Sequence, residues 1–379
     1  MRENHLLASK QASKQASKQR ETNVELLKIV AIIFVVLSHS MPDGDTTVFS
    51  SAINLGAERN VQYLILQVMH NLGQIGNDVF LICSFWFLSS SSQIKGENII
   101  SLMADAFCVS VMSLLLFSLM GFRFPLKYLI KQFAPNLFGN SWFLACYLLI
   151  YAIHPALNYI ISSMKKQTLL LVSFVLGMIY CVIYFVLRNN ACYYNELVGF
   201  IVIYFFVGTV KNMEIYKATN RIKLLLTIVF LALLMVAINF ASTSISDSLY
   251  SRWNVFINPV FIVIAFSAFG IALKTKIATN NIANYLSSLS LLVYITHTNR
   301  VMRDYVRFAI FDWVKLNFTY QNLLVWCLLF FVFNLIYGIV FAIIYKETLQ
   351  KATKRVALWE SKIINDLYRK VVISMGIRE

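Results

Sequence analysis

The stretch that decides the fold is Asn23-Val-Glu-Leu-Leu-Lys-Ile-Val-Ala-Ile-Ile-Phe-Val-Val-Leu-Ser-His39. Apart from the polar residues near its two ends, among them Glu25 and Lys28, it is apolar. An α-helix needs about 20 such residues to cross the hydrocarbon core of a bilayer. Lipid offers the backbone no hydrogen-bond partners, so a spanning segment satisfies them within its own helix. The stretch therefore predicts a membrane-spanning helix.

Similar apolar runs recur as far as residue 345 and predict about ten spans in one membrane domain. The run from Val61 to Met69 is too short to span and is expected to lie at the membrane interface. The expected spans cover residues 25–41, 73–91, 100–120, 141–161, 168–187, 197–210, 222–241, 255–273, 286–310 and 322–345.

The composition supports an all-α, polytopic integral membrane protein. Of the 379 residues, 59% are hydrophobic and only 13% are charged, whereas a soluble domain is about 25% charged. In a soluble protein, a net charge of +15 would suggest that the protein binds nucleic acid. Here the basic residues cluster between apolar runs, as in membrane loops, so we expect no nucleic-acid partner. The cysteine spacing predicts neither a disulfide framework nor a metal site.

The two ends of the chain differ from the membrane domain of residues 23–345. Residues 1–22 form a basic, low-complexity tail that repeats Ala-Ser-Lys-Gln three times. Residues 346–379 combine basic residues with apolar ones near helical period, which predicts an amphipathic helix on an anionic leaflet or on a protein partner. Lys and Arg gather in alternate loops, so we expect both termini in the cytoplasm and the protein in the plasma membrane.

Ionisable residues within apolar segments are costly and therefore mark candidate functional positions. Lys28 and His39 are eleven residues apart, which brings them to within about 20° of one helix face and about 16 Å apart along it. Glu25 lies one turn before Lys28. Two structural alternatives remain: Lys28 as a snorkelling anchor, and His39 as a helix-end histidine bonded to a carbonyl.

Four motifs occur in an order that resembles the membrane-bound acyltransferase-3 family. The first is Glu25, Lys28 and His39 in the opening segment. The others are Asp78-Val-Phe-Leu-Ile-Cys-Ser84, Ser141-Trp142-Phe143-Leu144 and Ser290-Leu-Leu-Val-Tyr294-Ile-Thr-His297. The resemblance covers about residues 23–345.

The sequence departs from the family pattern in three places. Lys28 stands where the family usually has Arg, which keeps the charge but loses the planar fork. Phe85-Trp86 replaces Gly-Tyr, and of an Arg-rich turn after the second helix only Lys95 remains.

The resemblance implies transfer of an acyl group, commonly acetyl from acetyl-CoA, to a carbohydrate hydroxyl. It suggests a bacterial enzyme for a surface polysaccharide or its lipid-linked precursor, with polysaccharide-assembly proteins as partners. His39 would be the catalytic residue, either as general base or as transient acyl carrier. The predicted substrate-binding residues are Lys28, Glu25, Asp78, Ser84, Trp142, Tyr294 and His297.

Five of the substrate-binding residues have a more specific expected role. Lys28 would attract the phosphates of CoA. Ser84 and Tyr294 would donate hydrogen bonds to an oxyanion, and Trp142 would stack on a ring. Asp78 would either orient His39 or cap the start of a helix.

Two residues outside the motifs are further candidates, and two other functions remain as alternatives. His70 and Arg59 are placed in the first outer loop, within reach of the acceptor. The alternatives to a transferase are a secondary transporter or flippase for a sugar or lipid, and a polysaccharide polymerase. A transporter of this kind favours helices broken by Gly or Pro at matching positions of its two halves. The chain has only five prolines and shows no such paired breaks.

Overall fold

The computed structural model describes residues 22–41, 61–132, 142–182, 195–245, 258–306, 309 and 323–374, and within them it contains helices and no strand. The predicted all-α class is confirmed. The helices are α2 (Thr22–His39), α4 (Val61–Leu88), α5 (Gly96–Leu119), α6 (Leu126–Gln132), α7 (Trp142–Ser163), α8 (Lys166–Val182), α9 (Asn195–Asn212), α10 (Ile215–Ala218), α11 (Arg221–Ile245), α13 (Pro259–Lys274), α14 (Asn281–His297), the π-helical turn η2 (Met302–Val306), α16 (Leu323–Thr348) and α17 (Gln350–Ser374).

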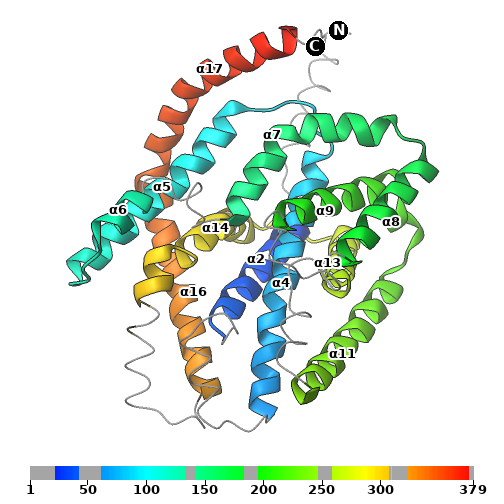
Figure 1. The fold of residues 1–379 in the computed structure, drawn as a ribbon, viewed down its shortest axis with the longest axis horizontal. Coiled ribbons are helices and arrows are strands. Elements are labelled where there is room, and N and C mark those ends of the chain that lie inside the picture. Colours follow the sequence, from blue (N-terminus) through cyan, green and yellow to red (C-terminus); the bar gives the residue numbers. More distant parts are fainter. Residues whose placement is uncertain are drawn as a thin grey trace.

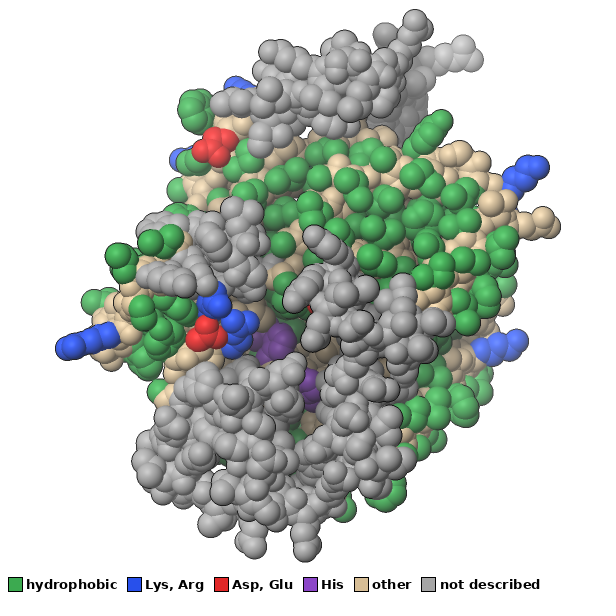
Figure 2. All heavy atoms as spheres, viewed as in Figure 1, with side chains coloured by type: hydrophobic (Ala, Val, Ile, Leu, Met, Phe, Trp, Pro, Cys, Tyr) green, Lys and Arg blue, Asp and Glu red, His purple; other side chains and the backbone are tan. Residues whose placement is uncertain are grey.

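Five of these helices are long and apolar enough to cross a membrane: α2, α5, α7, α11 and α16. The apolar helices α8 and α13 are shorter. On α11, Phe230, Leu233 and Phe240 are each more than 60% exposed, which a soluble surface rarely tolerates in such a run. Figure 2 shows hydrophobic side chains covering much of one face. The protein is therefore a polytopic membrane protein.

Two predicted segments differ from the structure. Residues 61–69 do not form a separate interfacial segment but are the first turns of the continuous, 28-residue helix α4. Polar residues lower the hydropathy of this part, yet Gln67 and Asn71 are buried among neighbouring helices. The expected span 286–310 is broken after His297, where α14 ends.

An asparagine explains the break after α14. The side chain of Asn299 accepts a hydrogen bond from the backbone N–H of Val301 at 2.8 Å, which replaces a helical partner. Its amide also donates to Ser110 of α5 at 3.2 Å. The chain is thereby turned out of α14 into η2 directly after His297.

Helices α2 and α4 pack side by side through the middle of the bundle (Figure 1). Small residues permit the close approach, since a Cβ on Gly76 would lie 2.6 Å from the carbonyl oxygen of Ala31, and one on Gly73 would collide with Ser38. Lys28 lies near Phe87 and Ser38 near His70, so the two helices are antiparallel.

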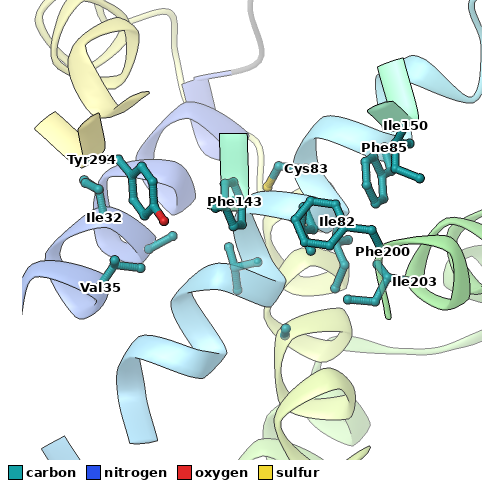
Figure 3. Close-up of a cluster of buried hydrophobic side chains, with 14 of the residues drawn as sticks. Ile32, Val35, Ile82, Cys83, Phe85, Phe143, Ile150, Phe200, Ile203 and Tyr294 are labelled. Atoms are coloured by element: carbon teal, nitrogen blue, oxygen red, sulfur yellow. The ribbon is translucent and has the colours of Figure 1, made fainter. Parts of the chain in front are cut away.

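The largest apolar core surrounds these two helices. Figure 3 shows Ile32 and Val35 of α2, Phe143 of α7 and Tyr294 of α14 around one centre. The rings of Phe143 and Tyr294 are 5.2 Å apart. The core thus fixes α2 against α14, the two helices that carry the histidines discussed below.

The tail helix α17 lies along α5 (Figure 1). Asp105 of α5 anchors its start, because the carboxylate accepts a hydrogen bond from Gln350 at 3.2 Å, beside one from Tyr345 of α16 at 2.7 Å. Ala357 is buried on the packed side, whereas Val356 and Trp359 point outward and are 55% and 70% exposed. The described apolar residues Val356 and Trp359 of α17 therefore face away from the protein.

Candidate active site

The geometry centres on two histidines from distant parts of the chain. His39 is the last residue of α2 and His297 the last of α14. The Nδ1 of His39 lies 2.8 Å from the Nε2 of His297, and the ring centroids are 5.1 Å apart. His39 is half-buried and His297 is buried. Figure 2 shows histidine side chains at the surface of this face.

The backbone of α14 sets the proton positions in this pair. The Nδ1 of His297 lies 2.8 Å from the carbonyl oxygen of Val293, which can only accept. In the neutral ring Nδ1 therefore carries the hydrogen and Nε2 the lone pair. His39 must then donate from its own Nδ1, which leaves the lone pair of His39 on Nε2. In this arrangement the Val293 carbonyl sets the tautomer of neutral His297, and His297 in turn sets that of neutral His39.

At the other end of α2, Lys28 forms an ion pair with Glu25, with Nζ and Oε1 3.1 Å apart. The ammonium also lies 6.0 Å from the centroid of Phe87 on α4. Glu25 is buried and Lys28 is about one-fifth exposed. Because α2 is one unbroken helix, the ion pair and His39 lie along one line through the protein.

Of the predicted aromatic residues, Tyr294 lies against His297, and Trp142 is linked to Tyr294 through Phe143. The ring of Tyr294 is buried and meets His297 edge-on, with centroids 5.7 Å apart. Phe143 separates it from Trp142, whose ring is 5.8 Å from that of Phe143. Trp142 is 37% exposed at the start of α7, where a ring can meet a ligand or lipid.

Asp78 does not take either of its predicted roles. It is in the middle of α4, so it caps no helix start, and its carboxylate has no hydrogen-bond partner among the described residues. Gly76 faces α2, and Asp78 projects about 160° away from it around the helix. It shares its face with Asn71, which bonds to Asn239 of α11. His297, rather than Asp78, orients His39.

Ser84 lies apart from the histidine pair. Its hydroxyl donates to the carbonyl oxygen of Phe80 at 2.8 Å, within α4 itself. The antiparallel packing puts Gly73 opposite Ser38 and Phe87 near Lys28, so Ser84 is nearer the Lys28 end. The structure therefore does not bring Ser84 to His39.

His70 is not in an outer loop, as predicted, but within α4, and it is buried. Ser38 donates to its carbonyl oxygen at 2.7 Å and lies 3.2 Å from its Nδ1. The contact between His70 and Ser38 therefore holds α4 against α2 at the residue before His39. Arg59 and Ser141 lie outside the described residues.

The features of α4 that support the site were not predicted from the sequence. The Gly73-x-x-Gly76 spacing was a signal for close helix packing. Polar residues at helical spacing, Gln67, Asn71, Gln74 and Asp78, were a signal that α4 is longer than its apolar part. The described residues contain no group of three His, Cys, Asp or Glu that could hold a metal ion.

The comparison with known proteins identifies the family of the chain. No curated protein and no solved structure matches the chain. The model of the acyltransferase-3 family, described as an acyltransferase domain, matches residues 21–346. The match runs from the start of α2 to the end of α16 and so includes both histidines. Because it covers most of the sequence, the chain belongs to the acyltransferase-3 family of membrane proteins.

Proposed function

We propose that this membrane acyltransferase moves an acetyl group from acetyl-CoA to a hydroxyl of a cell-surface polysaccharide or its lipid-linked precursor. The observation that carries the proposal is the contact between His39 and His297, 2.8 Å, with His297 held in turn by the carbonyl of Val293. This relay keeps a lone pair on His39, as a general base requires.

The transfer uses His39 twice. Its Nε2 takes the proton of the sugar hydroxyl while the oxygen attacks the carbonyl carbon of the thioester. A new C–O bond forms, the C–S bond breaks, and the proton returns from His39 to the departing thiolate. His297 stabilises the transient imidazolium, because its Nε2 accepts the hydrogen on Nδ1 of His39. In the alternative route His39 first takes the acetyl group itself and passes it on.

The donor would approach from the Lys28 end of α2. Lys28 is the positive charge on the line that leads to His39, and phosphates of CoA would compete with Glu25 for it. A donor in the cytoplasm and an acceptor on the outer side require a path along α2. Membership of an acyltransferase family favours this function over a transporter or flippase.

The remaining parts of the hypothesis concern the cell. We place the protein in a bacterial plasma membrane with both termini in the cytoplasm, since the basic loops favour that side. Polysaccharide-assembly proteins are the expected partners there.

The test compares His39 with a histidine outside the proposed site. A strain lacking the gene is complemented with wild type, His39→Gln or His154→Gln, and surface glycan is analysed by mass spectrometry. His154 is a matched control, because it is buried in α7 with its Nδ1 2.6 Å from the carbonyl oxygen of Tyr151. Wild type and His154→Gln should restore acetylated residues and His39→Gln should not. Acetylated glycan with equally abundant His39→Gln protein would refute the proposed role.

A further inference from the structure

The segment that follows His297 places charged side chains next to the active site. Asn299 turns the chain, and Arg300 comes three residues after His297. Arg300 Nε and Arg303 Nε both donate to Asp304, at 3.0 Å and 2.8 Å. Figure 2 shows Lys or Arg and Asp or Glu side chains beside a histidine on this face. Two guanidinium groups share one carboxylate, so the cluster keeps a net positive charge.

Arg300 has hydrogen-bonding capacity that its neighbours do not use. Its side chain is 24% exposed, and its Nη1 is buried without a hydrogen-bond partner in the described part of the chain. A buried, unpaired guanidinium N–H costs free energy unless something accepts from it. A carboxylate or phosphate oxygen is the acceptor that suits a guanidinium best.

Three aromatic rings lie against the same segment. Phe124 and Tyr128 are stacked, with centroids 5.7 Å apart and planes 13° apart. The ring of Tyr305 meets both edge-on, at 4.9 Å and 5.0 Å. Rings of this kind offer apolar faces to the C–H faces of a sugar while their hydroxyls reach its polar groups.

The hydroxyl of Tyr128 links the rings to the charges. It is buried without a hydrogen-bond partner among the described residues. Burial raises the pKa of this phenol, and the nearby Asp304 carboxylate raises it further, while Arg300 acts in the opposite direction. The Tyr128 hydroxyl therefore stays protonated and can donate a hydrogen bond, and it lies close enough to Asp304 and Arg300 to be affected by their charges.

We infer that Arg300, Tyr128 and Tyr305 form the acceptor subsite and that it selects an acidic sugar. The inference rests on the proposed function, since the subsite has a role only if His39 deprotonates a sugar hydroxyl. Arg300 binds the anionic group of the sugar, Tyr128 donates to a ring hydroxyl, and Tyr305 packs against the ring. Asp304 holds Arg300 in place through its Nε. The anion is a carboxylate, as in a uronic acid, or a sugar phosphate.

The subsite also explains why the break after α14 is useful. A continuous helix would carry residue 300 along the α14 axis, whereas the Asn299 turn brings η2 against Phe117 of α5 and the rings beyond it. The same turn thus ends the helix at His297 and presents Arg300 beside it.

Sugar binding to the full chain in lipid nanodiscs tests the inference. Glucuronic acid, glucose 1-phosphate and glucose are titrated separately against wild type, Arg300→Gln and Arg221→Gln by saturation-transfer NMR. Arg221 is an exposed arginine at the start of α11 and serves as the charge-matched control. The wild type and Arg221→Gln should bind at least one acidic sugar more tightly than glucose, and Arg300→Gln should lose that preference by roughly tenfold, the scale of a charged hydrogen bond.

Several results would overturn the inference. They are equal binding of glucose and both acidic sugars, no binding of either acidic sugar, or an unchanged preference in Arg300→Gln. Preference for glucuronic acid indicates a uronic-acid acceptor, and preference for glucose 1-phosphate indicates a phosphorylated one. Acetyl-CoA hydrolysis is measured in the same nanodiscs with wild type and His39→Gln. A wild type without a preference for acidic sugars, or an Arg300→Gln variant that keeps the preference, rejects the subsite alone if hydrolysis is intact and depends on His39. Hydrolysis that is independent of His39 rejects the proposed function.

Discussion

The two ends of α2 hold their ionisable residues by different means. Near its start, Lys28 is paired with Glu25, three residues away on the same helix. At its end, His39 is paired with His297, 258 residues away on α14. The first contact exists whenever α2 is helical, while the second exists only when α2 and α14 are packed together. Local helical geometry forms the ion pair at the Lys28 end, and tertiary packing forms the histidine pair at the His39 end.

The difference has an energetic consequence. The charge on Lys28 is already paired with the carboxylate of Glu25, so a phosphate gains only by displacing or sharing that carboxylate. The lone pair of His39, in contrast, is positioned before any substrate arrives, because His297 is itself fixed by Val293. Substitutions at the histidine end should therefore cost more activity than those at the lysine end.

The largest expected effect is at His39. His39→Ala and His39→Gln should each lower acetyl transfer on the order of 10²-fold or more, the usual contribution of a general base. Glutamine keeps a polar side chain but not the basicity, so it should do no better than alanine. Transfer of radioactive acetyl groups in membranes measures the rate. If His39→Gln transfers at a near-normal rate, the two ends of α2 do not differ as argued, and His297 becomes the candidate base.

The next effect concerns His297 as a positioning residue. His297→Phe removes the acceptor for Nδ1 of His39 and should slow transfer on the order of tenfold, with less loss in His297→Gln, which retains an accepting oxygen. The pH dependence of kcat should shift in the phenylalanine variant, because the imidazolium of His39 loses its partner. An equal loss in both variants with an unchanged pH profile would indicate packing alone.

The lysine end should respond more weakly than His39 and in a different parameter from both histidines. Lys28→Ala should raise the KM for acetyl-CoA by roughly tenfold, as expected when a hydrogen bond of about 1.5 kcal/mol to a charged group is lost. Lys28→Arg should be close to wild type, since it keeps the charge. Steady-state kinetics at varied acetyl-CoA separate KM from kcat. A lower kcat with unchanged KM in both variants would assign Lys28 to packing.

The smallest effect on chemistry should follow removal of α17. This helix packs on α5 and α16, and among the described residues it makes no extensive contact with α2. Truncation after Thr348 removes the contact of Gln350 with Asp105, so it should lower the thermal stability and membrane yield. Acetyl transfer per folded molecule should stay near wild type. A stable, abundant truncated protein without transfer would show that the tail serves the active site.

Much of the fold was predictable because membrane spans obey a local rule. Apolar runs of sufficient length must become helices in lipid, so the bounds of α2 and α16 follow closely from residues 25–41 and 322–345. The rule failed for α4, since a helix buried by its neighbours can carry Gln67 and Asn71 without losing its length. Hydropathy reports contact with lipid, and it misses a helix whose polar face is covered by protein.

The sequence by itself determined that Lys28 and His39 share a face of one helix, because helical periodicity fixes the angle between them. It also supplied His297 and Asp78 as candidates but did not rank them as partners of His39. Only the tertiary structure decided that ranking: it turned Asp78 away from α2 and brought His297 to 2.8 Å from His39. The same packing placed Arg300 beyond the turn at Asn299, within the segment 286–310 for which hydropathy predicted a continuous helix. A pair of residues 258 positions apart leaves no periodic trace in the chain, since its distance depends on how whole helices pack rather than on local geometry.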